Sequence, residues 1–151
     1  MDNVQFEHIM SIAISREIEA HEFYQQVYER TEDAEVKKVF AQLAKEEMGH
    51  KELLEKFKYD PTMVMKIEAP PDYKVAEATE LPKLSIAMKP ADAIALAMKK
   101  EQQAVEFYRE FRDRATERSI KDVFENLANM ELGHKHRLEN VFVEIGYPEV
   151  F

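Results

Sequence analysis

Proline occurs at only a few places in the sequence, and its spacing leaves two long stretches in which helices can run without interruption. A proline inside a helix removes a backbone hydrogen bond and clashes with the preceding turn. The six prolines lie at positions 61, 70, 71, 82, 90 and 148, so residues 3–59 and 90–146 have none in their interiors. Each stretch has a polar break near its middle, at residues 31–33 and 115–117. The pattern predicts four helices of about 25 residues, forming helical hairpins over residues 3–58 and 90–146 of one domain spanning 1–151.

The residues at the expected helix ends are ones that commonly start or stop helices. Asp2 or Asn3 is suited to cap the first helix and Thr31 the second, because a side-chain oxygen there accepts a free backbone N–H. Pro90 suits the first turn of the third helix, where no N–H is needed. Gly146 is expected to end the fourth helix.

The segment between the hairpins, residues 59–89, contains four of the six prolines and is long for a loop. A chain of this length can run back along a helix roughly 40 Å long. We therefore expect a crossover that lets the third helix point the same way as the second, with one helical turn around residues 75–79. This is the single-crossover topology of an antiparallel four-helix bundle, which is an all-α fold.

The two hairpins repeat one another in sequence. When the chain is shifted by 84 residues without gaps, residues 13–57 match residues 97–141 at 18 of 45 positions. Such a repeat predicts two hairpins of similar design, related by an approximate two-fold axis. One functional site shared at this axis, or a symmetric pair of sites, would follow.

A glutamate interrupts the apolar stripe at the middle of each predicted helix. The four lie 14 to 16 residues from the nearest interhelical turn, so their carboxylates are expected in one layer about 20–25 Å from it. The second and fourth helices add a histidine three residues later, on the same face. The candidate site therefore consists of Glu17, Glu47, His50, Glu101, Glu131 and His134.

Four ionised carboxylates in an apolar core would be strongly unfavourable unless cations accompany them. Two divalent ions cancel their charge, and the sequence contains no cysteine that could serve as a thiolate ligand. Oxygen and imidazole donors suit iron or manganese, with zinc as a further occupant. The residues thus predict a two-metal site, most simply a di-iron site.

Several other polar side chains lie near this layer. Tyr24 and Tyr108 stand seven residues after Glu17 and Glu101, two turns along the same face. Their hydroxyls are placed either to hydrogen-bond a ligand carboxylate or to act as ordinary core tyrosines. The acids off the apolar stripe are interpreted as solvated surface charge; these are Glu19, Glu22, Glu46 and Glu106.

These features resemble the rubrerythrin-related branch of the ferritin-like di-iron carboxylate proteins, over nearly all of the chain outside the crossover. The resemblance rests on Glu17-x-x-Ala20 with Tyr24, Glu47-x-x-His50, Glu101-x-x-Ala104 with Tyr108, and Glu131-x-x-His134. It implies a ferritin-like fold with two iron ions, bridged by Glu47 and Glu131. It further implies Glu17 and Glu101 as terminal ligands, one histidine on each metal, and a homodimer.

Two departures from that family pattern bear on function. Rubrerythrins carry a cysteine-rich, rubredoxin-like iron domain that delivers electrons, whereas this chain has no cysteine. Electrons are therefore expected from an external donor, such as a rubredoxin-like protein. Rubrerythrins also have a carboxylate three residues after the glutamate of the third helix, where this chain has Ala104, and this weakens the expectation of peroxidase activity.

Composition excludes several other functions. The formal charge of −9 argues against nucleic-acid binding, which relies on clustered lysine and arginine. No apolar run is long enough to cross a membrane, and the N-terminus does not resemble a secretion signal. We therefore expect a cytoplasmic protein that binds neither nucleic acid nor membrane.

Three functions remain compatible with the site. The leading hypothesis is an oxidoreductase that reduces hydrogen peroxide or dioxygen at a di-iron centre. An iron-handling role, as a ferroxidase or storage protein, is the first alternative, and storage would require a closed shell of subunits. The other alternative is a binding module in which a redox-inert metal serves only stability.

Overall fold

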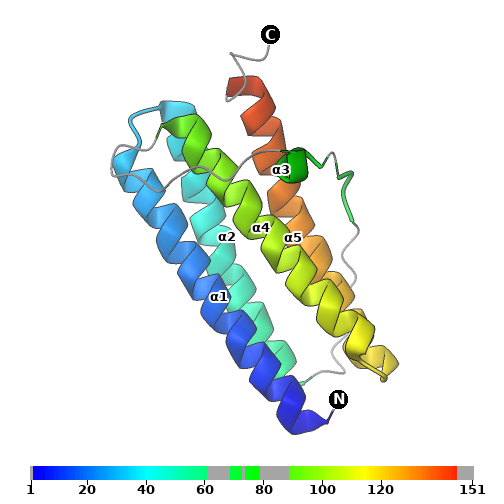
Figure 1. Cartoon of the computed structure of the whole chain (residues 1–151). Coiled ribbons are helices and arrows are strands. Elements are labelled where there is room, and N and C mark those ends of the chain that lie inside the picture. Colours follow the sequence, from blue (N-terminus) through cyan, green and yellow to red (C-terminus); the bar gives the residue numbers. More distant parts are fainter. Residues whose placement is uncertain (1, 61–68, 73, 79–88, 146–151) are drawn as a thin grey trace.

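Four long helices lying side by side make up most of the computed structural model, which describes residues 2–60, 69–72, 74–78 and 89–145 (Figure 1). The helices are α1 (Asn3–Arg30), α2 (Ala34–Tyr59), the single turn α3 (Val75–Ala78), α4 (Pro90–Arg114) and α5 (Arg118–Ile145). The hairpins α1–α2 and α4–α5 pack against each other, and α4 runs in the same direction as α2. This arrangement confirms the predicted all-α, ferritin-like bundle with its long crossover. None of the helices in the described ranges combines the length and apolar character that a membrane span requires.

The helix ends follow the sequence signals with one exception. The Asp2 carboxylate accepts the Gln5 N–H at 2.7 Å, and the Gln5 side chain accepts the Asp2 N–H at 3.0 Å, which closes a capping box on α1. Thr31 does not cap α2, as the sequence had suggested, because α2 begins only at Ala34; Thr31 ends α1 instead, with its N–H bonded to the Val27 carbonyl. Asp33 caps α2 instead. The predicted helix stop at residues 146–148 lies outside the described residues.

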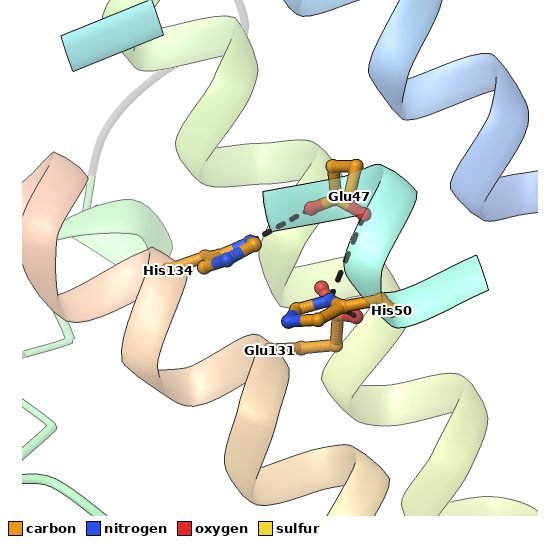
Figure 2. Close-up of side chains that lie close together, drawn as sticks. All are labelled: Glu47, His50, Glu131 and His134. Atoms are coloured by element: carbon orange, nitrogen blue, oxygen red, sulfur yellow. Dashed lines mark ion pairs between the residues drawn. The ribbon is translucent and has the colours of Figure 1, made fainter. Parts of the chain in front are cut away.

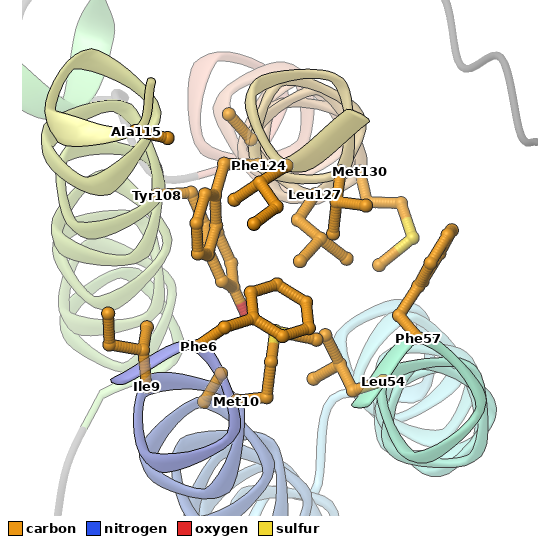
Figure 3. Close-up of a cluster of buried hydrophobic side chains, with 14 residues drawn as sticks. Phe6, Ile9, Met10, Leu54, Phe57, Tyr108, Ala115, Phe124, Leu127 and Met130 are labelled. Carbon is orange, nitrogen blue, oxygen red and sulfur yellow. The ribbon is translucent and has the colours of Figure 1, made fainter. Parts of the chain in front are cut away.

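The bundle core consists of two apolar clusters, one on each side of the layer of buried glutamates. The first lies near the N-terminus of α1 and the C-terminus of α2 and includes Phe6, Met10, Leu54, Phe57, Phe124 and Leu127 (Figure 3). The second lies towards the α1–α2 turn and includes Tyr24, Phe40, Leu43, Ile94, Met98 and Leu138. The glutamates therefore occupy the middle of the interior, between the two apolar clusters.

A fully buried lysine fastens the described part of the crossover to α5. The Lys135 ammonium lies 2.7 Å from Asp72, 2.6 Å from Glu77 and 3.7 Å from Glu139. Glu139 also accepts the Ala76 N–H at 3.0 Å. Burial disfavours the charged lysine, but hydrogen bonds to Asp72 and Glu77 outweigh burial and raise the pKa of Lys135. The ammonium therefore stays charged and holds the crossover in place.

The internal repeat does not extend to this contact. The equivalent lysine of the first hairpin is Lys51, which pairs with Glu55 at 3.5 Å. The side chains of this pair are 28% and 45% exposed, because the described crossover residues pack on the second hairpin. One repeated pair is thus a surface contact, while the other is part of a buried ionic cluster.

Replacement of Lys135 with methionine is expected to lower the free energy of unfolding by about 2–3 kcal/mol, because Glu139 would remain buried without its cation. The loss should stay below that of a wholly buried pair, since Asp72 and Glu77 reach solvent. Urea denaturation measures the effect. Lys51→Met is the matched control and should change stability by less than about 0.5 kcal/mol. Equal effects of the two substitutions would contradict a special role for the buried lysine.

Candidate metal centre

Four glutamates, one from each long helix, meet in the middle of the bundle. Glu17, Glu47, Glu101 and Glu131 are each at most 3% exposed. One turn further along α2 and α5, His50 and His134 turn their rings into the same layer, with ring centroids 4.6 Å apart. Ligand atoms of Glu47, His50, Glu131 and His134 can all lie within 4.8 Å of one another (Figure 2). The structure therefore brings all six sequence-predicted side chains together.

The two imidazoles face carboxylates from different helices. His134 Nδ1 lies 2.7 Å from Glu47 Oε1 and 3.4 Å from Glu101 Oε1. His50 Nδ1 lies 3.4 Å from Glu131 Oε1, 3.6 Å from Glu17 Oε2 and 3.8 Å from Glu47 Oε2. Glu47 directs one oxygen towards each histidine (Figure 2). The donors thus form two neighbouring groups that share the Glu47 carboxylate.

Most donor atoms of this layer lack a hydrogen-bond partner among the described residues. They are Glu17 Oε2, both oxygens of Glu47, Glu101 Oε2, Glu131 Oε1, and Nδ1 of His50 and of His134. Buried polar atoms are nearly always partnered in folded proteins. Two divalent cations would partner this donor set and balance the charge of four carboxylates, so the residues present fit a two-metal group.

The electrostatics of the layer show how strongly the carboxylates interact. Burial, together with the charges of Glu17 and Glu101, raises the pKa of Glu131 well above its usual value. Burial opposes ionisation of Glu101 as well, but hydrogen bonding to Glu131 and the charge of His134 lower its pKa to about 2. Burial alone would lower the pKa of His134, but Glu101 and Glu46 raise it to about 9. Protons on Glu131 and His134 therefore supply part of the positive charge that metal ions would bring.

Two tyrosines bind Glu17 and Glu101 from the opposite hairpin. The Tyr24 hydroxyl on α1 donates to Glu101 on α4, and the Tyr108 hydroxyl on α4 donates to Glu17 on α1 at 3.2 Å. Burial and the neighbouring carboxylates raise the pKa of both tyrosines, so both remain hydrogen-bond donors. Of the two sequence interpretations, the structure shows the hydrogen bond to a carboxylate.

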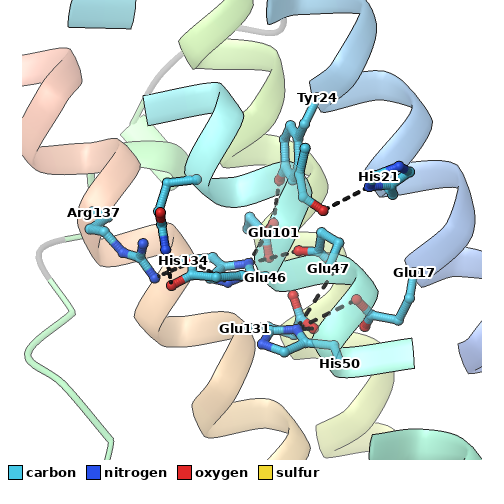
Figure 4. Close-up of polar contacts among 12 residues, drawn as sticks. Glu17, His21, Tyr24, Glu46, Glu47, His50, Glu101, Glu131, His134 and Arg137 are labelled. Carbon is cyan, nitrogen blue, oxygen red and sulfur yellow. Dashed lines mark hydrogen bonds and ion pairs between the residues drawn. The ribbon is translucent and has the colours of Figure 1, made fainter. Parts of the chain in front are cut away.

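Glu46 is a part of the site that sequence reasoning missed. It was interpreted as solvated, but its Oε2 lies 3.2 Å from His134 Nε2 and 2.6 Å from Arg137 (Figure 4). Burial opposes its ionisation, but hydrogen bonds from His134 and Arg137 prevail and lower the pKa of Glu46 to about 2. A carboxylate on the outer nitrogen of a metal-binding histidine orients the ring. The repeat gave no signal for this contact, because Met130 and Leu53 stand where Glu46 and Arg137 would recur.

The fold and the site together define a four-helix bundle with a buried glutamate and histidine cluster suited to metal ions. A family model described as Rubrerythrin matches residues 8–142, so the chain belongs to the rubrerythrin family. Among solved structures, a hypothetical protein from Pyrococcus furiosus is similar, with 28% sequence identity and a TM-score of 0.65. That similarity covers 91% of this chain and 88% of the other. No curated protein matches the sequence.

Proposed function

We propose that the protein is a di-iron carboxylate oxidoreductase that reduces hydrogen peroxide or dioxygen with electrons from an external donor. The observation that carries the proposal is the convergence of four buried glutamates and two histidines, most of whose donor atoms lack hydrogen-bond partners among the described residues. Membership of the rubrerythrin family supports iron as the metal. The mixed oxygen and imidazole donor set is equally compatible with iron and manganese, and zinc is a further occupant.

The six side chains would divide between the two ions. Glu47 already faces both histidines, which suits a bridging carboxylate, and Glu131 is its counterpart in the repeat. Glu17 and Glu101 are held from behind by tyrosine hydroxyls, which suits terminal ligands on the two sides of the site. His50 and His134 would each bind one ion.

When bound, two ferrous ions would supply the two electrons that reduction of an O–O bond requires. The surrounding residues set the conditions for that chemistry. The apolar clusters cover the layer on both sides along the bundle axis, and Tyr24 and Tyr108 keep their protons beside the ligand carboxylates. Because the 151 residues contain no cysteine, re-reduction is assigned to a separate donor, such as a rubredoxin-like protein.

The proposal is tested first by metal analysis of protein purified without added metal, and then by its reactivity. The iron(II) form is mixed with one equivalent of peroxide, or with oxygenated buffer, and iron oxidation is followed by absorbance. We expect two iron ions per chain and oxidation faster than that of free iron(II) at the same pH. Oxidation no faster than that of free iron(II) with either oxidant would remove the oxidoreductase proposal.

The contact from Glu46 to His134 predicts that the two metal positions differ in affinity. Glu46→Ala should weaken binding of one ion about 10- to 100-fold and leave the other nearly unchanged, because Glu46 contacts His134 and not His50. Calorimetric titration with zinc resolves the two steps. Glu52→Ala, an exposed glutamate on the same helix, is the control and should leave both steps unchanged. Equal weakening of both steps by Glu46→Ala would contradict the assignment.

A further inference from the structure

A cavity of about 340 Å³ lies between α1 and α4 and reaches the glutamate layer. Carboxylates and tyrosine hydroxyls of the site form its inner side. Its outer walls include Ile12, Ala20, Ala104 and Phe107. The two alanines occupy equivalent positions of the repeat, and their small side chains leave this space open. The cavity is therefore partly polar at its base and apolar along its walls.

The volume exceeds what the proposed oxidants need. Pockets that bind small organic molecules begin at about 300 Å³, a size suited to ligands of roughly six to ten non-hydrogen atoms. Hydrogen peroxide and dioxygen have two such atoms each. The cavity thus has room for a larger molecule beside the metal positions.

Two cations lie at the cavity, each placed over an aromatic ring of the opposite helix. The Arg16 guanidinium on α1 lies 4.5 Å from the ring centre of Phe107, and the Lys100 ammonium on α4 lies 5.0 Å from that of Phe23. The two pairs are equivalent in the repeat. Because α1 and α4 run in opposite directions, the pairs lie on opposite sides of the glutamate layer.

The charges lining this cavity outside the glutamate layer favour an anion. Arg16 and Lys100 are accompanied there by one acid, Glu19, so the cations outnumber it. Contact with the aromatic rings of the opposite helix favours positions of both cations beside the cavity. An anionic group at either cation would gain from its charge.

We propose that this cavity binds a small organic carboxylate, with its apolar body against Ala20 and Ala104 and its carboxylate at one of the two cations, Arg16 or Lys100. The inference rests on the proposed metal centre, because the negative charge of the glutamates at the base would repel an anion unless bound cations neutralised it. It adds an organic ligand to a site whose proposed oxidants each have two non-hydrogen atoms.

Binding can be measured without any reaction by using protein loaded with zinc, which is redox-inert. Calorimetry or NMR titration compares benzoate with benzyl alcohol, which has nearly the same shape and no charge. We expect benzoate to bind at least about tenfold more tightly than the alcohol. Absence of benzoate binding, or equal affinity for the two probes, would overturn the inference.

Two sets of variants separate the apolar and the charged contributions. Ala104→Leu should lower benzoate affinity about tenfold or more by filling the cavity, whereas Ala41→Leu, at an exposed site on α2, should not. The double variant Arg16→Gln/Lys100→Gln should lower benzoate affinity about tenfold and leave that for the alcohol unchanged. Unchanged benzoate affinity in the double variant would place the anion elsewhere and refute the proposed mode.

The metal content of each sample distinguishes this inference from the proposed function. Two zinc ions per chain with no benzoate binding would refute the organic ligand and leave the metal centre intact. A chain that binds no zinc or iron would refute the metal centre, and the anion site would fall with it, since the neutralising charge would be missing.

Discussion

Replacement of Glu131 with leucine is expected to abolish metal-dependent stabilisation while making the metal-free protein more stable. Glu131 is buried against two other carboxylates, and its raised pKa shows how unfavourable its charge is without metal. An apolar side chain of similar size removes the cost of burying this carboxyl and its repulsion by Glu17 and Glu101, so the metal-free protein should gain stability. Conversely, saturating metal at about 1,000 times its dissociation constant adds about 4 kcal/mol to a protein that binds it.

Thermal unfolding with and without zinc measures both effects in one experiment. The unsubstituted protein should gain stability with metal, whereas the Glu131→Leu variant should start higher and gain little. Glu144→Leu, an exposed site on the same helix, should keep the metal response of the unsubstituted protein. A variant that loses stability in the absence of metal would show that Glu131 serves the fold rather than a metal site.

Metal affinity should rise steeply with pH, by about tenfold per unit for one displaced proton and about a hundredfold from pH 6 to 8. The pKa of His134, which Glu101 and Glu46 raise to about 9 against the effect of burial, means that this imidazole holds a proton across the interval. A metal ion must displace it. Glu131, whose pKa is also raised, adds to the slope wherever it still holds its proton.

The sign of the effect on the metal-free protein follows from the same shift. A group with a raised folded-state pKa contributes stability below its ordinary value, here 6.5, and loses that contribution as the pH rises towards 9. The metal-free protein should therefore weaken over this range while metal binding strengthens. Calorimetry in buffers of different ionisation enthalpy counts the protons released. Zinc binding that releases no proton at pH 7 would contradict the assigned protonation of His134.

The helices and the glutamate layer could be predicted because their signals are local. Proline spacing and the polar breaks placed all four long helices, and the 3.6-residue period set which face of each is buried. Equal distances from the turns then put Glu17, Glu47, Glu101 and Glu131 at one level, as the structure shows. That these residues bind metal remains a prediction, for which the orphaned donor atoms are the physical support.

The prediction that Thr31 caps α2 was wrong, and the reason is again local. Thr31 and Asp33 are both good capping residues, separated by one position. Thr31 ends α1, and its N–H bonds the Val27 carbonyl. Asp33 directly precedes α2, and its carboxylate accepts the first N–H groups of that helix. Competition between two adjacent helix ends for the same residues cannot be ranked from residue type alone.

By itself, the sequence determined the helical bundle, its crossover and the level of the buried acids, because periodicity and spacing along one chain are enough to set them. Only the tertiary structure decided which of two equivalent charged residues is buried. Lys51 and Lys135 both follow a Gly-His pair and both precede a glutamate by four residues. They differ because the crossover packs on α5, bringing Asp72 and Glu77 to Lys135, while Lys51 stays at the surface. The tertiary structure also brings Glu46 on α2 to His134 on α5, a contact between helices that no local pattern identifies.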